Sequence, residues 1–521
     1  MTRRGTHKKS AADDDRRHWS DDDCKLSIRK AGRRFSRITA ALLATLMLLS
    51  FAACDKGDGG TTTTATEAAT EVAATSSTAS GHLEVIDFGG ETVSVAYRGG
   101  PDAMEIYAEM LNGEIVNDYV YERNLVIEAR LGVKLEFVSY GSATTAEIPS
   151  AMISSVLAGD CEHDVIAWSQ YRMLPLAVKG FFYDVQDTEY LHFDKPWWNN
   201  EYMDEVNLHA GKRFFLMGDI SLGAIRKTGA VFYNKALYEG LTHEKDGLYR
   251  EVKEGKWTIE RMAQLSRDVF SDLNSNGSAD VGIDILGCAA STVANTEMFA
   301  YAAGFRVFRW DEGGVPVFVA EEEQNGNIIA RLQNLYHHCE GFAPTVNDTY
   351  VFNSDSLTQD FLAGRLLFMA SWLMSCEQLQ GEKNCGIIPY PKYDEEQERY
   401  LSLIQDTATV FGVPASCRRE DMVSAVLEVW CHENYRRVFP GYYEMALKLK
   451  YSSDEISSQM IDLIHDGAVT DVGYAYNYAL ASVGTVMRPV MASDANIYAS
   501  RIKALKKMVN RNMDTLIAAF R

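Results

Sequence analysis

After residue 53 the sequence lacks the features that mark several common protein classes. It has no apolar run of about 20 residues, the length that a membrane-spanning helix needs. It has no HExxH, no GxSxG and no glycine-rich phosphate-binding motif, and it contains no internal repeat. The sequence therefore gives no support to an integral membrane protein, a metalloprotease, an α/β-type serine hydrolase or a nucleotide-binding enzyme.

Cysteine patterns that would predict a metal site or a disulfide framework are also missing. The sequence has no CxxC pair and no helical Cys–His spacing, so it predicts no zinc site. The cysteines after residue 54 are odd in number and widely scattered, which does not indicate a disulfide framework. These seven are Cys161, Cys288, Cys339, Cys376, Cys385, Cys417 and Cys431.

Basic residues are scarce in the same part of the chain. Without its first 53 residues the chain keeps 39 basic and 66 acidic residues, a formal charge of −27. Such a surface repels nucleic acids and anionic lipid headgroups, so neither is an expected partner. The 440 residues after position 81 are enough for two domain-sized hydrophobic cores.

The first 53 residues have the pattern of an export signal. Their apolar segment, residues 38–53, is too short for a permanent membrane span and ends in Ala52-Ala53-Cys54. Cys54 resembles the lipidated cysteine of a bacterial lipobox, although Phe51 stands where that pattern usually has leucine. A basic stretch precedes the segment and would stay on the cytoplasmic side: Arg29, Lys30, Arg33, Arg34 and Arg37.

We therefore predict that residues 1–53 are a signal peptide with a long N-terminal extension. Residues 54–81, rich in Thr, Ala, Ser and Glu, would be a lipidated, low-complexity tether that holds the chain on the outer face of the cell membrane. The alternative is a buried apolar helix beside an incidental cysteine. It is disfavoured because this low-complexity segment could not pack against such a helix.

The folded part begins with alternating strands and helices. Residues 91–97, 133–140 and 164–168 have strand patterns, and helical stretches separate them. This rhythm predicts a parallel α/β lobe that binds ligands at the C-terminal ends of its strands. Further strands are expected at 214–217 and 229–233, a second α/β stretch up to about residue 390, a return crossing at 403–413, and helices at 423–430, 456–464 and 499–520.

A set of short sequences resembles the extracellular solute-binding proteins of ABC importers, the maltose-binding-like group in its long lipoprotein form. They follow the family order over nearly the whole mature chain. They are ERNLVIEARLGVKL at 122–135, DVIAW at 164–168, PWW at 196–198, GKRFFLMGD at 211–219, FYNK at 232–235, WT at 257–258, FLAGRLLF at 361–368, GIIPYPKY at 386–393 and PGYY at 440–443.

The resemblance implies an α/β, two-lobed fold of the type II periplasmic-binding-protein kind, with crossing hinge strands and a helical C-terminal part. The crossings would fall near residues 230–233 and 404–410. Lobe 1 would comprise about 88–230 plus 406–470, and lobe 2 about 231–405 plus the C-terminal helices. Such a protein acts as a monomer, closes over a small solute and docks on permease subunits, with no catalytic step and no required cofactor.

The resemblance also implies ligand-binding residues. A sugar has apolar faces and a rim of hydroxyls, so its receptor needs flat aromatic rings together with planar polar side chains. An aromatic residue at the end of an apolar run can equally belong to the core. The implied residues are Trp168, Gln170 and Tyr171 in lobe 1, Trp372 in lobe 2, Tyr474 and Tyr476 near the C-terminus, and Asp219 and Asp406 beside the crossings.

Residues 272–280 resemble the first half of an EF-hand calcium loop. Asp272, Asn274, Asn276 and Asp280 supply oxygen side chains at alternate positions, and a glycine stands at the sixth. Ile283 replaces the glutamate expected at the twelfth. A structural calcium ion and a plain polar turn are both open interpretations.

The preferred function is capture of a carbohydrate for an ABC importer, with peptides and polyols as further ligand classes. Two alternatives stay open. One is a sensor accessory or adhesin with the same fold, and the other is a lipid-anchored exported hydrolase that uses a pair of its many carboxylates.

Overall fold

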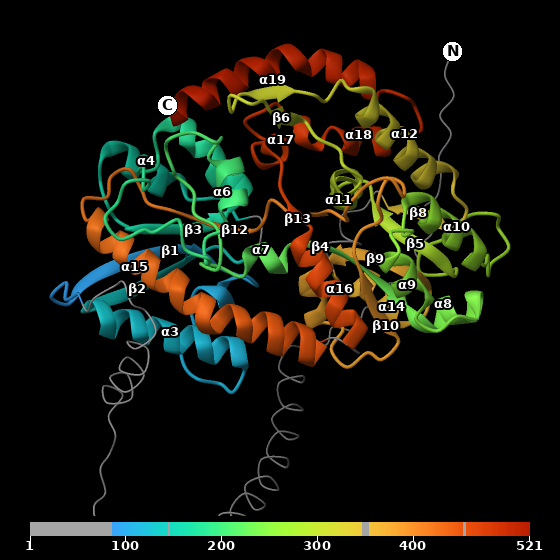
Figure 1. The fold of residues 1–521 in the computed structure, drawn as a ribbon, viewed down its shortest axis with the longest axis horizontal. Coiled ribbons are helices and arrows are strands. Elements are labelled where there is room, and N and C mark those ends of the chain that lie inside the picture. Colours follow the sequence, from blue (N-terminus) through green and yellow to red (C-terminus); the bar gives the residue numbers. More distant parts are fainter. Residues whose placement is uncertain (1–85, 144–145, 346–353, 452–454) are drawn as a thin grey trace, which may run out of the picture. The chain divides into compact units, whose positions relative to one another are not determined.

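The computed structural model describes residues 86–521 except 144–145, 346–353 and 452–454 (Figure 1). The predicted signal peptide, Cys54 and the tether lie outside these residues. Within the described part, none of the helices combines the length and the apolar character that a membrane span requires.

The first sheet consists of three strands predicted near the start of the folded part and one strand from the predicted return crossing. Its order is β12-β3-β1-β2. Strand β1 pairs in parallel with both β2 and β3, whereas β12 pairs antiparallel with β3. Helices α3 and α15 pack together beside this sheet. The bounds are β1 Glu91–Arg98, β2 Val133–Tyr140, β3 Val165–Ser169, β12 Thr409–Gly412, α3 Ile115–Leu131, α4 Ser150–Ala158 and α15 Glu420–Glu433.

Gly132 shows why α3 ends where it does. Its φ of 57° lies in the left-handed region, and an added Cβ would lie 2.1 Å from Oδ1 of Asp87. Only glycine fits both conditions, so the helix stops and the chain turns directly into β2.

The second sheet has five strands in the order β10-β4-β9-β5-β8. Strands β5, β8 and β9 run parallel, while β4 is antiparallel to both of its neighbours. Two separate sheets covered by helices confirm the predicted α/β class. The bounds are β4 Gly229–Asn234, β5 Leu286–Ser291, β8 Phe342–Thr345, β9 Leu366–Trp372, β10 Cys385–Ile388, α10 Ile259–Val269, α11 Ala294–Ala302, α12 Glu323–His338 and α14 Ser354–Leu362.

The chain passes between the two sheets just before the position expected from the sequence. Residues 230–233 lie inside β4, whose six residues are all buried between β9 and β10. The passage is at Thr228, which forms an antiparallel bridge with Ile404 of the returning chain. A third segment joins them, because β13 (Ala468–Val469) pairs in parallel with β11 (Ser402–Leu403). We call these three segments, which are residues 226–228, 402–406 and 468–469, the crossing segments.

The C-terminal region contacts both sheets. Helix α15 packs against α3, whereas α16 (Glu455–Asp466) packs against β10 of the second sheet, although the sequence had placed 406–470 with the first lobe. Residues 214–217 form no full strand and contribute only an isolated bridge between Leu216 and Phe411. The other elements include α5 Gln170–Met173, α6 Asn200–Val206, α7 Gly223–Arg226, α8 Lys235–Thr242, α9 Gly247–Lys253, β6 Phe308–Trp310, β7 Pro316–Phe318, α17 Val472–Ala475, α18 Met487–Met491 and α19 Tyr498–Phe520.

Candidate functional site

A cavity of about 670 Å³ lies between the C-terminal edges of the two sheets. The loops that follow β1, β2 and β3 line one side of it, and segments that follow β5, β8 and β9 line the other. Ligands of parallel α/β folds bind at this edge, because the loops after the strands converge there. We call it the interlobe cavity. These loops and segments contribute Pro101, Ser142, Tyr171, Ala294, Thr358 and Met374, among others.

Four of the eight expected ligand-binding residues line the interlobe cavity: Tyr171, Trp372, Asp406 and Tyr474. The ring of Tyr171 lies 5.6 Å from that of Tyr478, and the Arg172 guanidinium lies 4.5 Å from the Tyr171 ring centroid. Tyr478 also lines the cavity and is 58 % exposed. Two aromatic rings and a cation therefore stand together on the first-sheet side.

Trp372 provides the aromatic residue on the opposite side. It is the last residue of β9 and pairs with Gly229 of β4, so its backbone is fixed within the second sheet. Its side chain is half-buried, and its Nε1 is buried with no hydrogen-bond partner in the described part of the chain. Trp372 therefore adds a largely apolar indole to the wall of the cavity.

Trp168 and Gln170 lie outside the cavity. Trp168 is completely buried, and its Nε1 donates to the carbonyl oxygen of Ala146 at 2.8 Å. Gln170 is also fully buried, and its Oε1 accepts a hydrogen bond from the hydroxyl of Tyr202. Both side chains are covered by neighbouring elements, because position at the end of a strand does not determine which face of the sheet is open.

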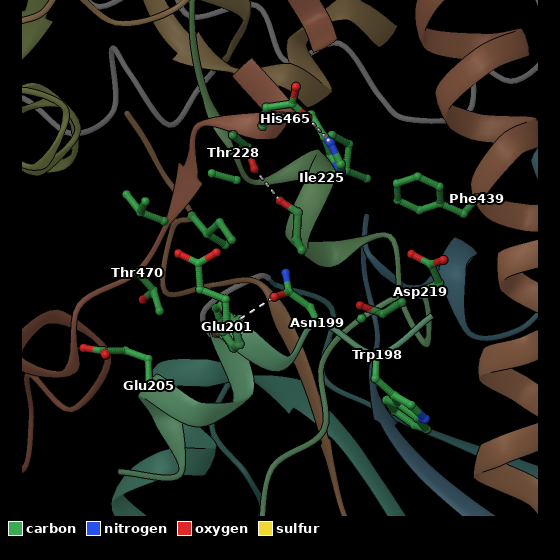
Figure 2. A pocket seen from close by; sticks show the side chains of 18 of the residues that line it. Trp198, Asn199, Glu201, Glu205, Asp219, Ile225, Thr228, Phe439, His465 and Thr470 are labelled. Atoms are coloured by element: carbon green, nitrogen blue, oxygen red, sulfur yellow. Dashed lines mark hydrogen bonds and ion pairs between the residues drawn. The ribbon is translucent and has the colours of Figure 1, made fainter. Parts of the chain in front are cut away.

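Tyr476 and Asp219 are likewise separated from the interlobe cavity. Tyr476 is fully buried and donates its hydroxyl to the carbonyl oxygen of Val206 at 2.6 Å. Asp219 lines a second cavity of about 430 Å³, in which Figure 2 shows it together with Trp198, Thr228 and other residues. Burial raises the pKa of Asp219 to about 7.

The second cavity, which we call the hinge cavity, shares the crossing segments with the first. Thr228 and Ile404 line the hinge cavity, whereas their neighbours Lys227 and Gln405 line the interlobe cavity. The crossing segments therefore contribute to the walls of both cavities. Movement of these segments would change both cavities together.

An ion-pair cluster at the base of the interlobe cavity was not anticipated from the sequence. The carboxylate of buried Asp102 accepts from Arg98, from Arg226 at 3.0 Å and from Lys227 at 3.3 Å. Burial acts to raise the pKa of Asp102, but the three positive charges outweigh it and lower the pKa. Burial and the charge of Asp102 raise the pKa of nearby Glu105 to about 7.

Arg226 extends this cluster to the second sheet. Its Nε and Nη2 donate to the two oxygens of Glu377 at 3.0 and 3.2 Å, and the Tyr442 hydroxyl also donates to Glu377. Arg226 therefore links the loop after β1 with the segment after β9. In the sequence, the feature that could have indicated this cluster was the pair of adjacent basic residues, Arg226 and Lys227, shortly before the predicted strand at 229–233.

Asp406 lies in the returning crossing segment and faces cations from other elements. Burial raises its pKa to about 6, while the charges of Arg488 and Arg172 oppose that rise. Both arginines line the interlobe cavity, and Arg488 is paired with the buried carboxylate of Glu297. The cavity thus offers guanidinium donors and a carboxylate acceptor beside aromatic rings, which suits a ligand that is both polar and ring-shaped.

The loop at 272–280 forms a polar turn in which Gly277 has a φ of 78°. Oδ2 of Asp272 accepts from the Gly277 amide at 2.8 Å, and such backbone hydrogen bonds lower the pKa of Asp272. The side-chain amides of Asn274 and Asn276 both point at Oδ2 of Asp280, at 2.7 and 2.6 Å. The Oδ1 atoms of Asn274 and Asn276 accept backbone amides instead, so both side-chain amides would have to turn to offer oxygen to an ion, and calcium binding stays a prediction.

Comparison with known proteins gives similarity in structure but not in sequence. No protein-family model matches the chain, and no curated protein matches it. Three sugar-complexed structures are similar to 82 % of the chain. The first is an ABC substrate-binding protein of Listeria monocytogenes with cycloalternan, at 12 % identity, with 99 % of that chain covered and a TM-score of 0.51. The second is the galacto-N-biose-/lacto-N-biose I-binding protein of Bifidobacterium longum with lacto-N-biose, at 12 % identity, with 99 % of that chain covered and a TM-score of 0.53. The third is an ABC transporter associated binding protein of B. animalis subsp. lactis with beta-1,6-galactobiose, at 13 % identity, with 98 % of that chain covered and a TM-score of 0.53.

At such low identity the similarity concerns the fold alone. The described chain has the two-lobed fold of the type II periplasmic binding proteins.

Proposed function

We propose that the protein is a monomeric, lipid-anchored extracellular solute-binding protein that captures a carbohydrate and delivers it to the permease of an ABC importer. The export signal and Cys54 support the location, and the fold supports a role in binding rather than catalysis. Delivery would follow closure of the lobes over the solute, with the tether keeping the protein close to the permease.

The interlobe cavity is the observation that carries this proposal. Its volume of about 670 Å³ lies within the range of about 300–1,000 Å³ that small-molecule sites take. Half-buried Trp372 faces it from the second sheet and exposed Tyr478 from the C-terminal segment, so apolar ring faces are available on both sides. Arg172, Asp406 and Arg488 add hydrogen-bonding groups that suit hydroxyls.

A thermal-shift screen tests the proposal. The soluble chain starting at His82 is titrated with mono- and oligosaccharides, with peptides as a comparison set. A ligand that binds only the folded state stabilises it by about 2.7 kcal/mol at a concentration one hundred times its Kd. We expect a saccharide to raise the melting temperature and Trp372→Ala to abolish that rise.

Trp310→Ala is the matched control, because Trp310 is also half-buried but does not line the interlobe cavity. This variant should keep the saccharide response. Stabilisation by peptides alone would contradict the carbohydrate assignment and leave solute transport standing. No response to either set would count against solute capture and favour a sensor accessory or adhesin of the same fold.

A further inference from the structure

Two cysteines and an aspartate far apart in the sequence meet at one edge of the first sheet. The sulfurs of Cys161 and Cys417 and a carboxylate oxygen of Asp164 all lie within 4.8 Å of one another. Cys161 is in the loop before β3, Asp164 immediately precedes β3, and Cys417 follows β12, the neighbouring strand. Within the described residues, this is the group of His, Cys, Asp and Glu side chains that satisfies the geometry of a three-ligand metal site.

We propose that Cys161, Asp164 and Cys417 bind a divalent cation of the zinc type. Tetrahedral zinc holds thiolates at about 2.3 Å, which places two sulfurs about 3.8 Å apart, so the observed cluster needs to contract by no more than about 1 Å. Thiolate sulfur selects soft or borderline cations over calcium and magnesium. A water molecule would complete the fourth position.

The surroundings of Asp164 orient it for this role. Its Oδ2 accepts from the Ser94 amide at 2.9 Å and from the guanidinium of Arg419, whereas the thiol of Cys161 lies 3.9 Å from Oδ1. Oδ1 is therefore the oxygen that faces the Cys161 sulfur. Hydrogen bonds to the second oxygen of a metal-binding carboxylate are the outer-shell contacts that fix such ligands.

Charge balance also suits a divalent cation. Two thiolates and a carboxylate carry three negative charges, and a divalent cation compensates two of them. The remaining charge lies next to Arg419, which pairs with Asp164 and also with Glu91. Free cysteine side chains are mostly thiols at neutral pH, whereas the thiolate is the form that binds a metal. Binding of one cation would release both thiol protons to the solvent and would consume no oxidant.

The exposure of the three groups fits entry from solvent into a structural site. Cys161 is exposed, whereas Asp164 and Cys417 are buried. The cluster precedes the N-terminal end of β3, and the interlobe cavity lies at the C-terminal end of the same strand. The cation would join the loop before β3 to the segment after β12 and stabilise the first lobe, without contacting a bound solute.

The pattern of the sequence did not predict this site, because its two cysteines are separated by about half of the chain. Only the neighbouring positions of β3 and β12 in the sheet bring them together.

Cobalt(II) is the probe for the test. The full chain is reduced, purified in detergent without oxygen and titrated with Co²⁺. The double variant Cys161→Ser/Cys417→Ser is titrated in the same way. The control is Cys385→Ser, which alters a cysteine outside the cluster. We expect the wild type and the control to bind one more Co²⁺ than the double variant, with a thiolate-to-cobalt charge-transfer band that Zn²⁺ removes. Arg419→Gln should keep the band and weaken binding about tenfold.

Identical titrations of the wild type and the double variant would overturn the proposal. A Cys161–Cys417 disulfide, found by mass spectrometry in protein isolated from the cell surface, would overturn it as well, since it would show that the pair is oxidised rather than metal-bound. Circular dichroism of the double variant confirms that it is folded, so that loss of the band reports the loss of ligands.

Discussion

Trp168 and Trp372 show how differently two similar residues can be used. Both end a buried strand in the sequence, and both were expected in the cleft. Trp168 is fully enclosed and hydrogen-bonded to Ala146, whereas Trp372 is half-buried on the cavity wall. The difference depends on which elements cover each residue.

Trp168→Ala should therefore act on stability. Removing a fully buried tryptophan leaves a cavity and an unpaired carbonyl, and we expect a loss of about 3 to 5 kcal/mol in the free energy of unfolding. Denaturant unfolding measures it, with Trp168→Phe as the control that keeps most of the apolar volume and should lose less. A loss below about 1 kcal/mol would show that this side chain is not part of the core.

The loop at 272–280 carries a prediction at the scale of a single element. If the loop binds calcium, millimolar calcium should raise the melting temperature above that in EDTA, because the ion binds only the folded loop. Asp280→Asn should remove the difference. Asp311→Asn is the control, since Asp311 also accepts backbone amides in a polar turn but lies outside the loop. Equal melting temperatures in calcium and EDTA would identify a plain polar turn.

The crossing segments carry a second prediction at this scale. Arg226 is buried and pairs with Asp102 and Glu377. Arg226→Met would leave the buried Asp102 and the part-buried Glu377 short of positive charge, and we expect a destabilisation of about 3 kcal/mol in denaturant unfolding. Lys507→Met, a change at an exposed position of α19, should have almost no effect. Equal stability of the two variants would mean that the other cations of the cluster compensate fully.

Buried carboxyl groups set the pH dependence of the whole molecule. In an unfolded chain these groups titrate near pH 4, but in the folded protein they keep their protons to higher pH. Between about pH 4 and about pH 7 the folded state binds more protons, so its stability falls as pH rises through this interval. Burial raises the pKa to about 7 in Glu105, Asp219, Glu428 and Asp471 and to about 6 in Asp406.

We expect the melting temperature to be several degrees higher at about pH 5 than at about pH 8. Asp219→Asn should reduce this difference, because the amide cannot ionise. Asp514→Asn, at an exposed site, should leave it unchanged. A melting temperature that rises across the interval would show that these carboxyl groups are ionised in the folded protein.

The sequence by itself determined the elements and the general architecture. Strands β1, β2, β3 and β4 and helices α15, α16 and α19 lie within a few residues of their predicted positions, because hydrophobic periodicity and the turn at Gly132 are local properties. The α/β class followed from their order. The loops that bear cavity residues could be expected too, since parallel strands bring their C-terminal ends to one edge.

Tertiary structure decided which side chains line the cavity at the C-terminal ends of the strands. Tyr171, Trp372, Asp406 and Tyr474 reach the interlobe cavity, while other elements enclose the remaining four expected residues or direct them elsewhere. The Asp102–Arg226–Glu377 cluster and the Cys161–Asp164–Cys417 group depend on contacts between distant segments. Burial and long-range contacts are properties of the packed chain, so only the folded molecule could show them.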